Sequence, residues 1–164
     1  MSRQVWVAGL GIISAIGNNV AENLNALRSG TTGIGPLRHL ETLHRDVFPA
    51  GEVKMSNEAL AALAAAPPDL PRTALLSLIA AREAFASTGL PEALLPSCAF
   101  ISANTIGGMD RTEYYMQALL TGTPDPDPDL VKYHDGGAIT ALTAEALGIQ
   151  GTIRTISTAC SSSA

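Results

Sequence analysis

The sequence is poor in aromatic and charged residues. Aromatic side chains make up 4% of the 164 residues and charged side chains 15%, against a hydrophobic share of 46%. A core with few rings must be built from small aliphatic side chains, which suit closely packed layers of helix and sheet. This balance favours a packed domain, or part of a larger one, over a disordered chain.

Long runs of one residue class are also missing. No apolar stretch reaches the length of a membrane span, and no run of Lys or Arg offers a basic surface, in a chain of net charge −5. The first residues lead into a short apolar run without the long apolar region of a signal peptide. We therefore expect no membrane partner, no nucleic-acid partner and a cytoplasmic location.

Metal-ligand patterns are lacking as well. The sequence has two cysteines, Cys98 and Cys160, which form neither a metal motif nor a disulfide framework. Cys98 lies in an apolar run and is expected to be structural. The Pro-Asp segment at 123–129 interleaves no other ligand type, so we expect a solvated loop and no metal. His39 and His44 have no partner at a recognisable spacing.

A Gly-rich segment follows the first apolar run, residues 5–8, which predicts a short strand. Glycines at 9, 11 and 17 do not match the spacing of a dinucleotide-binding fingerprint, which needs the third at 14. We therefore expect a tight structural loop at this position and no nucleotide site.

Helix caps and glycine stops divide the rest of the chain. Asn18 or Asn19 caps a helix that ends at Gly30, with Val20, Leu24 and Leu27 as its apolar stripe. Further helices are predicted at 56–66, 72–88, from Asp110 to 122 and at 135–147. Strands are predicted at 98–103, with both faces covered, and at 152–157, with an edge strand within 47–53. This alternation predicts an α/β fold with mainly parallel strands.

The C-terminal stretch carries the strongest chemical signal. The last predicted strand stops at small residues, and Cys160 comes three residues after its end, followed by three serines. Small residues on both sides allow a sharp turn with the thiol at its tip, and a helix beginning at or just after Cys160 would favour the thiolate. Its N–H groups could hold the oxyanion formed when the thiolate attacks a thioester. A lone cysteine is more often a small buried apolar residue, but three serines suit a core poorly.

Three segments together resemble the β-ketoacyl synthases, the condensing enzymes of fatty-acid and polyketide synthesis. They are Val7-Ala-Gly-Leu-Gly-Ile-Ile-Ser-Ala-Ile-Gly17, Ser102-Ala-Asn-Thr-Ile-Gly-Gly108 and Ser157-Thr-Ala-Cys-Ser-Ser-Ser163. The segment around the cysteine is the most specific, and the resemblance covers essentially the whole chain.

The resemblance implies a thiolase-like layered αβαβα sandwich of two similar halves, of which residues 1–164 form the N-terminal half. Cys160 matches the acyl-accepting cysteine, and its backbone N–H matches one donor of the oxyanion hole. Ile106, with Gly107 and Gly108, matches the lining of the acyl tunnel. The catalytic histidines and a lysine are expected from the C-terminal half, and His39, His44 and His134 do not match them.

The resemblance also implies substrates carried on the phosphopantetheine of an acyl carrier protein, with no cofactor of the enzyme's own. The expected partners are that carrier protein and either a second copy, giving a homodimer, or a complementing C-terminal chain. The chain alone is expected to be inactive. The alternatives are a non-catalytic chain-length-factor-like subunit, which would lack the nucleophile, and a structural fragment of a condensing-enzyme dimer.

Overall fold

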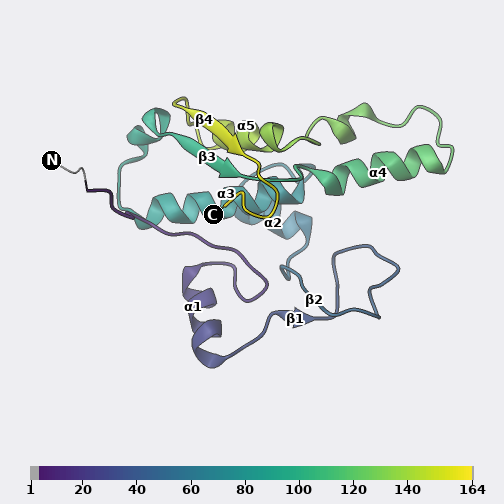
Figure 1. The fold of residues 1–164 in the computed structure, drawn as a ribbon, viewed down its shortest axis with the longest axis horizontal. Coiled ribbons are helices and arrows are strands. Elements are labelled where there is room, and N and C mark those ends of the chain that lie inside the picture. The colour runs from purple at the N-terminus through teal and green to yellow at the C-terminus, as the bar shows by residue number, and fades with distance from the viewer. Residues whose placement is uncertain (1–3, 164) are drawn as a thin grey trace. The chain divides into compact units, whose positions relative to one another are not determined.

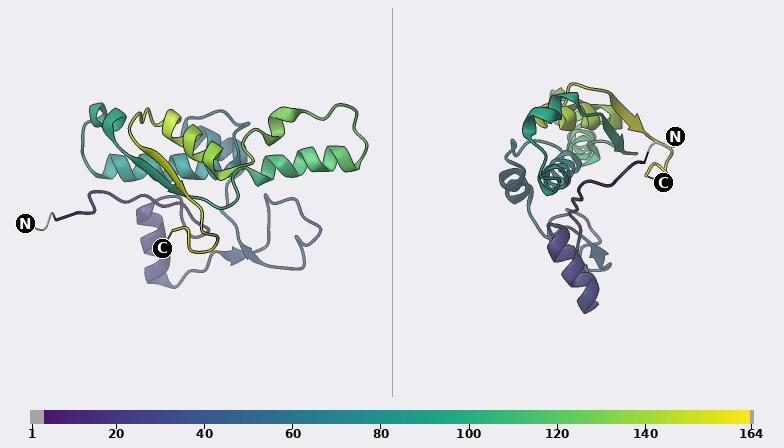
Figure 2. Two further views of the ribbon diagram at one scale, coloured as in Figure 1. Left: turned by 45° about the horizontal axis from the view of Figure 1, so that its top comes forward. Right: turned by 90° about the vertical axis from the view of Figure 1, so that its left-hand side faces the viewer.

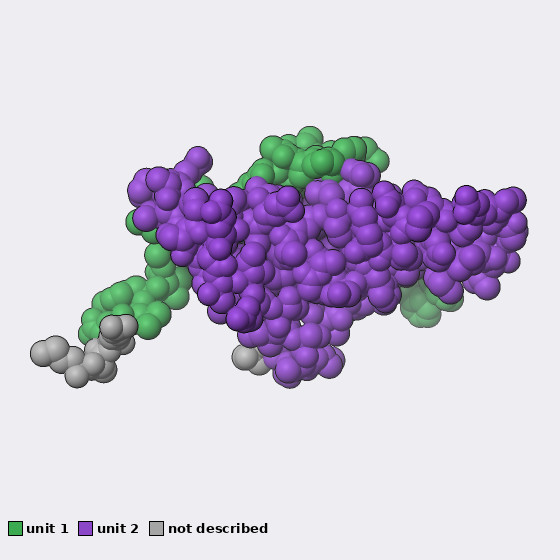
Figure 3. Space-filling model, turned by 90° about the horizontal axis from the view of Figure 1, so that it is seen from above, with its two compact units in different colours: residues 1–68, 79–90 green, residues 69–78, 91–164 purple. Residues whose placement is uncertain are grey.

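The computed structural model describes residues 4–163 and shows a mixed α/β chain (Figure 1). The chain divides into two compact units, residues 1–68 with 79–90 and residues 69–78 with 91–164 (Figure 3). We call them unit 1 and unit 2. The elements are, in order, α1 (Val20–Ser29), β1 (Ile34–Gly35), β2 (Ala50–Gly51), α2 (Asn57–Ala64), α3 (Arg72–Ser87), η1 (Glu92–Ser97), β3 (Phe100–Ala103), α4 (Met109–Leu120), η2 (Pro128–Val131), α5 (Gly136–Ala146) and β4 (Ile153–Ile156).

Helix α1 of unit 1 begins and ends as its capping residues predict. The Asn19 side chain accepts from the N–H of Glu22, and Gly30 closes the helix in the left-handed conformation. The predicted apolar stripe is wrong, since Leu24 and Leu27 are exposed and the buried residues are Asn23 and Ala26. Asn23 is satisfied there because its amide donates to the carbonyls of residues 17 and 19.

The strand predicted at residues 5–8 does not form. Val5, Trp6 and Val7 are 93%, 79% and 82% exposed, and no strand within residues 4–163 pairs with this segment. An apolar run becomes a strand only when a neighbouring strand takes up its backbone hydrogen bonds. The Gly-rich loop that follows is tight, as expected, because a Cβ on Gly11 would collide with the backbone of Ala80 and Ala84 in α3.

The segment between α1 and α2 holds only a minimal sheet. β1 and β2 pair antiparallel over two residues each, so the predicted edge strand within 47–53 is reduced to β2. The carboxylate of Glu52 organises the loop between them by accepting the N–H groups of Arg38, His39 and Leu40 at 2.7–3.0 Å. The Glu52 side chain thus supplies the acceptors for three backbone N–H groups, a role that a neighbouring strand plays in a larger sheet.

Helices α2 and α3 carry much of the buried apolar surface. Ser56 caps α2 as predicted, and the helix ends at Ala64, two residues before the predicted end, with Ala65 as its C-cap at φ of 44°. Helix α3 contributes residues 72–78 to unit 2 and 79–87 to unit 1, and Leu75 and Leu78 are fully buried.

Unit 2 is built on the parallel pair β3 and β4, with α5 packed against it (Figure 1). Burial alternates along both strands: Ser102 and Thr155 are half-buried, while Ile101 and Ile156 on the opposite face are exposed. The Thr155 hydroxyl donates to that of Thr140 in α5 at 2.7 Å, which identifies the covered face. The parallel pairing confirms the prediction, but the expectation of a strand covered on both faces is wrong for residues 4–163.

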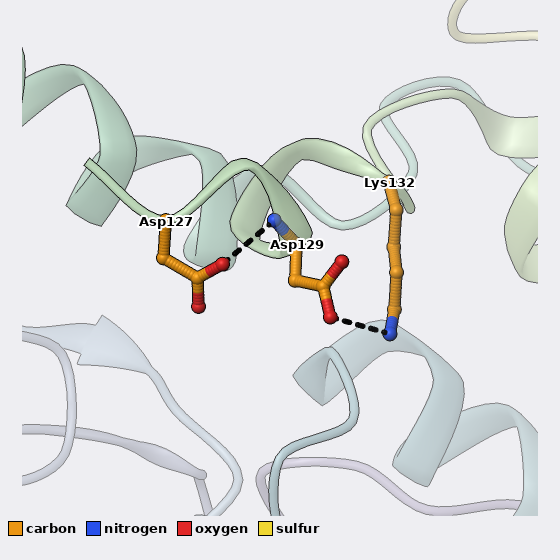
Figure 4. Close-up of polar contacts among 3 residues, drawn as sticks. All are labelled: Asp127, Asp129 and Lys132. Atoms are coloured by element: carbon orange, nitrogen blue, oxygen red, sulfur yellow. Dashed lines mark hydrogen bonds and ion pairs between the residues drawn. The ribbon is translucent and has the colours of Figure 1, made fainter. Parts of the chain in front are cut away.

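Helix α4 runs beside η2 in unit 2 (Figure 2). Asp110 is not its cap, contrary to the prediction: Gly108 occupies that position, and one Asp110 oxygen instead accepts the N–H of Arg72 at 2.8 Å. In η2, Asp127 caps the N-terminus and Lys132 pairs with Asp129 at 3.6 Å (Figure 4). The Pro-Asp segment therefore uses its carboxylates for local capping and a surface ion pair.

Candidate functional site

The parallel register brings two turns to one edge of the sheet. Phe100 pairs with Ile153 and Ala103 with Ile156, so β3 and β4 end together. The N–H of Asn104, the first residue after β3, donates to the carbonyl of Ile156 at 3.2 Å. Because the carboxyl ends of parallel strands share an edge, the turn after β3 and the turn after β4 are neighbours. We call them the glycine turn, residues 104–108, and the cysteine turn, residues 157–163.

The cysteine turn presents its thiol to solvent. Cys160 is exposed and free of any disulfide. Ala159, immediately before it, has φ of 53°, a left-handed conformation that costs an alanine about 1–2 kcal/mol. Two successive turn hydrogen bonds, from Ser161 N–H to the Thr158 carbonyl at 3.3 Å and from Ser162 N–H to the Ala159 carbonyl at 3.2 Å, close the bend. This is the exposed thiol on a sharp turn that the sequence predicts.

The serines after Cys160 have different environments. Ser162 is only 8% exposed, whereas Ser161 and Ser163 are exposed. The Ser162 hydroxyl accepts the N–H of Thr158 at 3.0 Å and donates to the Ala159 carbonyl at 2.7 Å. A helix beginning at or after Cys160 would extend past the described residues, so that expectation stays a prediction.

A threonine of the glycine turn joins the two turns. The Thr105 hydroxyl donates to the carbonyl of Ala159 at 3.1 Å and lies 3.2 Å from the Ser162 hydroxyl. Sequence reasoning did not single out Thr105 or Ser162. The run of serines signals polar surroundings, but only the register of β3 against β4 reveals which hydroxyls meet.

The predicted acyl-binding residues occupy the glycine turn. Ile106 is 52% exposed, while Gly107 and Gly108 are buried. The side-chain oxygen of Asn104 accepts the N–H groups of Ile106 at 3.2 Å and Gly107 at 3.1 Å, which fixes the bend. The structure thus brings the turn that carries Ile106 beside the cysteine turn.

The glycines are explained by close backbone packing. Gly107 has φ of 62°, and a Cβ on it would collide with the carbonyl of His134. The N–H of Gly108 donates to the Tyr133 carbonyl at 2.7 Å, and the Thr73 hydroxyl donates to the Gly107 carbonyl at 3.1 Å. Two segments of unit 2, residues 133–134 and Thr73 in α3, therefore hold the glycine turn in place.

The histidines and the second cysteine make contacts of their own. The His44 ring lies 5.6 Å from that of Phe48, and His134 Nδ1 lies 3.1 Å from the Thr112 hydroxyl. Cys98 is half-buried just before β3, with its sulfur 3.4 Å from the Leu94 carbonyl. Among residues 4–163, no group of three or more His, Cys, Asp or Glu is placed to hold a metal ion. Nor does that part of the chain contain a helix long and apolar enough to cross a membrane.

Comparison with known proteins gives consistent results. The family described as "Beta-ketoacyl synthase, N-terminal domain" matches residues 2–164. A curated relative, 3-oxoacyl-[acyl-carrier-protein] synthase 2 of Coxiella burnetii (strain RSA 493 / Nine Mile phase I), is 29% identical over 124 residues, which cover 74% of this chain and 30% of the relative.

Solved structures share the fold. The ishigamide ketosynthase/chain length factor is 28% identical with a TM-score of 0.81, over 98% of this chain and 41% of that one. The AntDE:AntF complex, a type II PKS acyl-carrier protein with its ketosynthase bound to the hexaketide, gives 16% identity and a TM-score of 0.57, over 88% of this chain and 38% of that one. The chain thus spans less than half the length of these proteins, and it belongs to the β-ketoacyl synthase family, whose N-terminal domain it matches.

Proposed function

We propose that this chain supplies the acyl-accepting cysteine, Cys160, of a β-ketoacyl synthase that condenses carrier-bound acyl groups in fatty-acid, polyene or polyketide synthesis. The observation that most supports this function is the exposed thiol of Cys160 on a strained turn, at the edge where two parallel strands end. Family membership supports the reaction class, and the geometry supports the assignment of the nucleophile.

The first half-reaction is acyl transfer to the sulfur. The Cys160 thiolate attacks the carbonyl carbon of an acyl thioester, the C–S bond to the phosphopantetheine thiol breaks, and the acyl group remains on the cysteine. The backbone N–H of Cys160 serves as one hydrogen-bond donor to the oxyanion formed on the way. Ile106, next to the buried Gly107 and Gly108, contacts the acyl chain.

The second half-reaction forms the carbon–carbon bond. A malonyl group on its carrier loses CO₂, the resulting carbanion attacks the acyl carbonyl, and the Cys160 thiolate departs. Positioned donors must stabilise the enolate formed by decarboxylation. We propose that these are two histidines and a supporting lysine outside residues 1–164, so that the chain alone does not condense substrates.

The complete enzyme is proposed to be a layered αβαβα sandwich of two similar halves. The exposed face of β3 and β4, with Ile101 and Ile156, and the unpaired run Val5–Val7 support this arrangement, since both offer apolar surface to further layers. The partners are an acyl carrier protein, as in the AntDE:AntF complex, and a second synthase chain or a complementing one. The proposal requires no cofactor on this chain and places the reaction in the cytoplasm.

Mass spectrometry tests the proposal on the intact protein with any partner chain. Incubation with the acetyl and octanoyl thioesters of N-acetylcysteamine should add one acyl group, mapped to Cys160. Cys160→Ala should abolish the adduct, whereas the matched variant Cys98→Ala should leave it unchanged. Acylation that persists in Cys160→Ala would contradict the assignment of the nucleophile.

A chain-length-factor-like subunit is the alternative, because one similar structure is a ketosynthase/chain length factor. Such a subunit needs no nucleophile, and the exposed Cys160 therefore favours the synthase. The acylation experiment described above distinguishes the two functions. A subunit without catalysis stays unacylated at Cys160 while its partner chain becomes acylated.

A further inference from the structure

Two hydroxyl groups brace the backbone that carries Cys160. Thr105 comes from the glycine turn and Ser162 from the far side of the cysteine turn. Both hydroxyls lie within 3.1 Å of the Ala159 carbonyl, and they lie 3.2 Å from each other. The Ser162 hydroxyl also accepts the N–H of Thr158 at 3.0 Å. We call this set of contacts the hydroxyl brace.

The hydrogens of the brace can be assigned. Each hydroxyl has one hydrogen to donate and two lone pairs. The Ala159 carbonyl receives three donors, because the backbone N–H of Ser162 also donates to it, at 3.2 Å. The hydroxyl of Ser162 donates its hydrogen to the Ala159 carbonyl and accepts the backbone N–H of Thr158. Thr105 then gives its hydrogen to the same Ala159 carbonyl. The carbonyl that precedes the Cys160 amide is therefore held from two sides.

The brace acts on a residue in an unfavourable conformation. Ala159 keeps φ of 53°, and a non-glycine residue stays in the left-handed region only when its surroundings hold it there. Without the Thr105 hydroxyl, that restraint weakens and Ala159 can relax toward negative φ. This change of φ rotates the peptide that joins Ala159 to Cys160. Rotation of this peptide moves both the Cys160 N–H and its sulfur, the two groups that acyl transfer must align.

We infer that Thr105 and Ser162 are positioning residues that hold Cys160 for acyl transfer; this inference rests on the proposed function. Acyl transfer requires the sulfur and the oxyanion donor to meet one carbonyl group, and a misplacement of about 1 Å can cost about a hundredfold in rate. Thr105 is exposed, so loss of its hydroxyl should affect the rate more than the stability.

The test compares Thr105→Val, Thr105→Ser and Thr121→Val in the intact protein. Thr121 is the matched control, because its hydroxyl also donates to backbone carbonyls, at 2.9 and 3.2 Å, but at the end of α4. The measured quantities are the single-turnover rate constant for acylation of Cys160 by octanoyl-N-acetylcysteamine, the thioester concentration giving half that rate, and the thermal midpoint.

Thr105→Val should lower the rate constant at saturating thioester at least about tenfold, with the half-saturating concentration changed less than about twofold. Thr105→Ser should restore the rate, and Thr121→Val should match the unmodified protein, with similar thermal midpoints for all. The double variant Thr105→Val/Ser162→Ala should be slowed by less than the product of the two single effects, because both hydroxyls act through one carbonyl, and fully independent effects would overturn that shared action.

Two results would overturn the inference while leaving the proposed function intact: a normal rate in Thr105→Val, or a rate in Thr105→Ser as low as in Thr105→Val. Failure of the proposed function has a different signature, since the unmodified protein itself would then acquire no acyl group on Cys160. That outcome overturns the inference as well.

Discussion

The carboxylate of Glu83 accepts the backbone N–H of Val20, the first residue of α1, at 2.7 Å. Its other oxygen accepts the N–H of Ile12 in the Gly-rich loop at 2.9 Å. A single side chain of α3 therefore holds both the loop and the start of the helix that follows it. The negative charge also lies at the positive end of α1, where it is favoured.

Removal of this carboxylate should loosen unit 1 locally. In Glu83→Ala we expect the amides of Ile12 and Val20 to exchange with deuterium faster, corresponding to a loss of about 1–3 kcal/mol of local stability. Exchange in β4 should not change. The control is Glu145→Ala, which removes an exposed glutamate from α5. Equal exchange in both variants would show that the two hydrogen bonds contribute nothing.

The end of α2 offers a stabilising substitution. Ala65 closes the helix with φ of 44° and ψ of 53°, a conformation that glycine adopts without strain. Ala65→Gly should therefore stabilise the protein by about 0.5–1 kcal/mol, the relief of strain exceeding the added entropy of the unfolded chain. Ala62→Gly, at an exposed position inside the same helix, should instead destabilise it by about 1 kcal/mol. Urea unfolding would detect the opposite signs, and a loss in both variants would contradict the strain argument.

Local chemistry made most of the helices predictable. Asn19, Ser56 and Asp135 each cap the helix that follows, because a short polar side chain can satisfy the free N–H groups of a first turn. The position of Cys160 on a turn was predictable for a similar reason, since small residues surround it. Asp110 shows the limit of this reasoning, because a distant N–H, that of Arg72, uses its carboxylate.

Features that depend on distant partners were not predictable in the same way. Residues 5–8 have a strand-like sequence but find no partner strand in the described part of the chain. Whether the second face of β3 is covered likewise depends on elements outside the strand, which the sequence of the strand does not reveal. The contact between Thr105 and Ser162 requires the register of two parallel strands, which lie about fifty residues apart.

The loop around Glu52 should respond to acid. Partial burial raises the pKa of Glu52, but the N–H groups of Arg38, Leu40 and His39 outweigh it and hold the pKa below its ordinary value. The charged form is therefore favoured in the folded loop. Its contribution is complete above the ordinary glutamate pKa and is lost as the pH falls through the lowered value.

Amide exchange of residues 38–40, corrected for its intrinsic pH dependence, measures this effect. Protection should fall on acidification through that range in the unmodified protein. In Glu52→Gln it should be lower throughout and independent of the carboxyl titration. Glu41→Gln, an exposed glutamate in the same loop, should keep the original pH dependence. A dependence that survives in Glu52→Gln would assign the effect to another group.

Gly107 and Gly122 illustrate two different reasons why a position requires glycine, close packing and backbone conformation. Both have positive φ, 62° and 73°, but a Cβ on Gly107 would collide with the backbone of His134, whereas nothing lies within 4 Å of one on Gly122. Gly122→Ala should therefore cost only backbone strain, about 1 kcal/mol after the lower entropy of the unfolded chain is included. Gly107→Ala should cost at least about 3 kcal/mol, because the backbone it meets cannot move aside as a side chain can.

The same pair connects packing to the proposed chemistry. Displacement of Gly107 would shift the glycine turn and with it Thr105, whose hydroxyl meets the Ala159 carbonyl. Gly107→Ala should therefore slow acylation of Cys160 even at temperatures where the protein remains folded, while Gly122→Ala should not. Unfolding midpoints and acylation rates measured on the same samples test both statements. Equal destabilisation by the two substitutions would mean that the close approach of His134 does not constrain this turn.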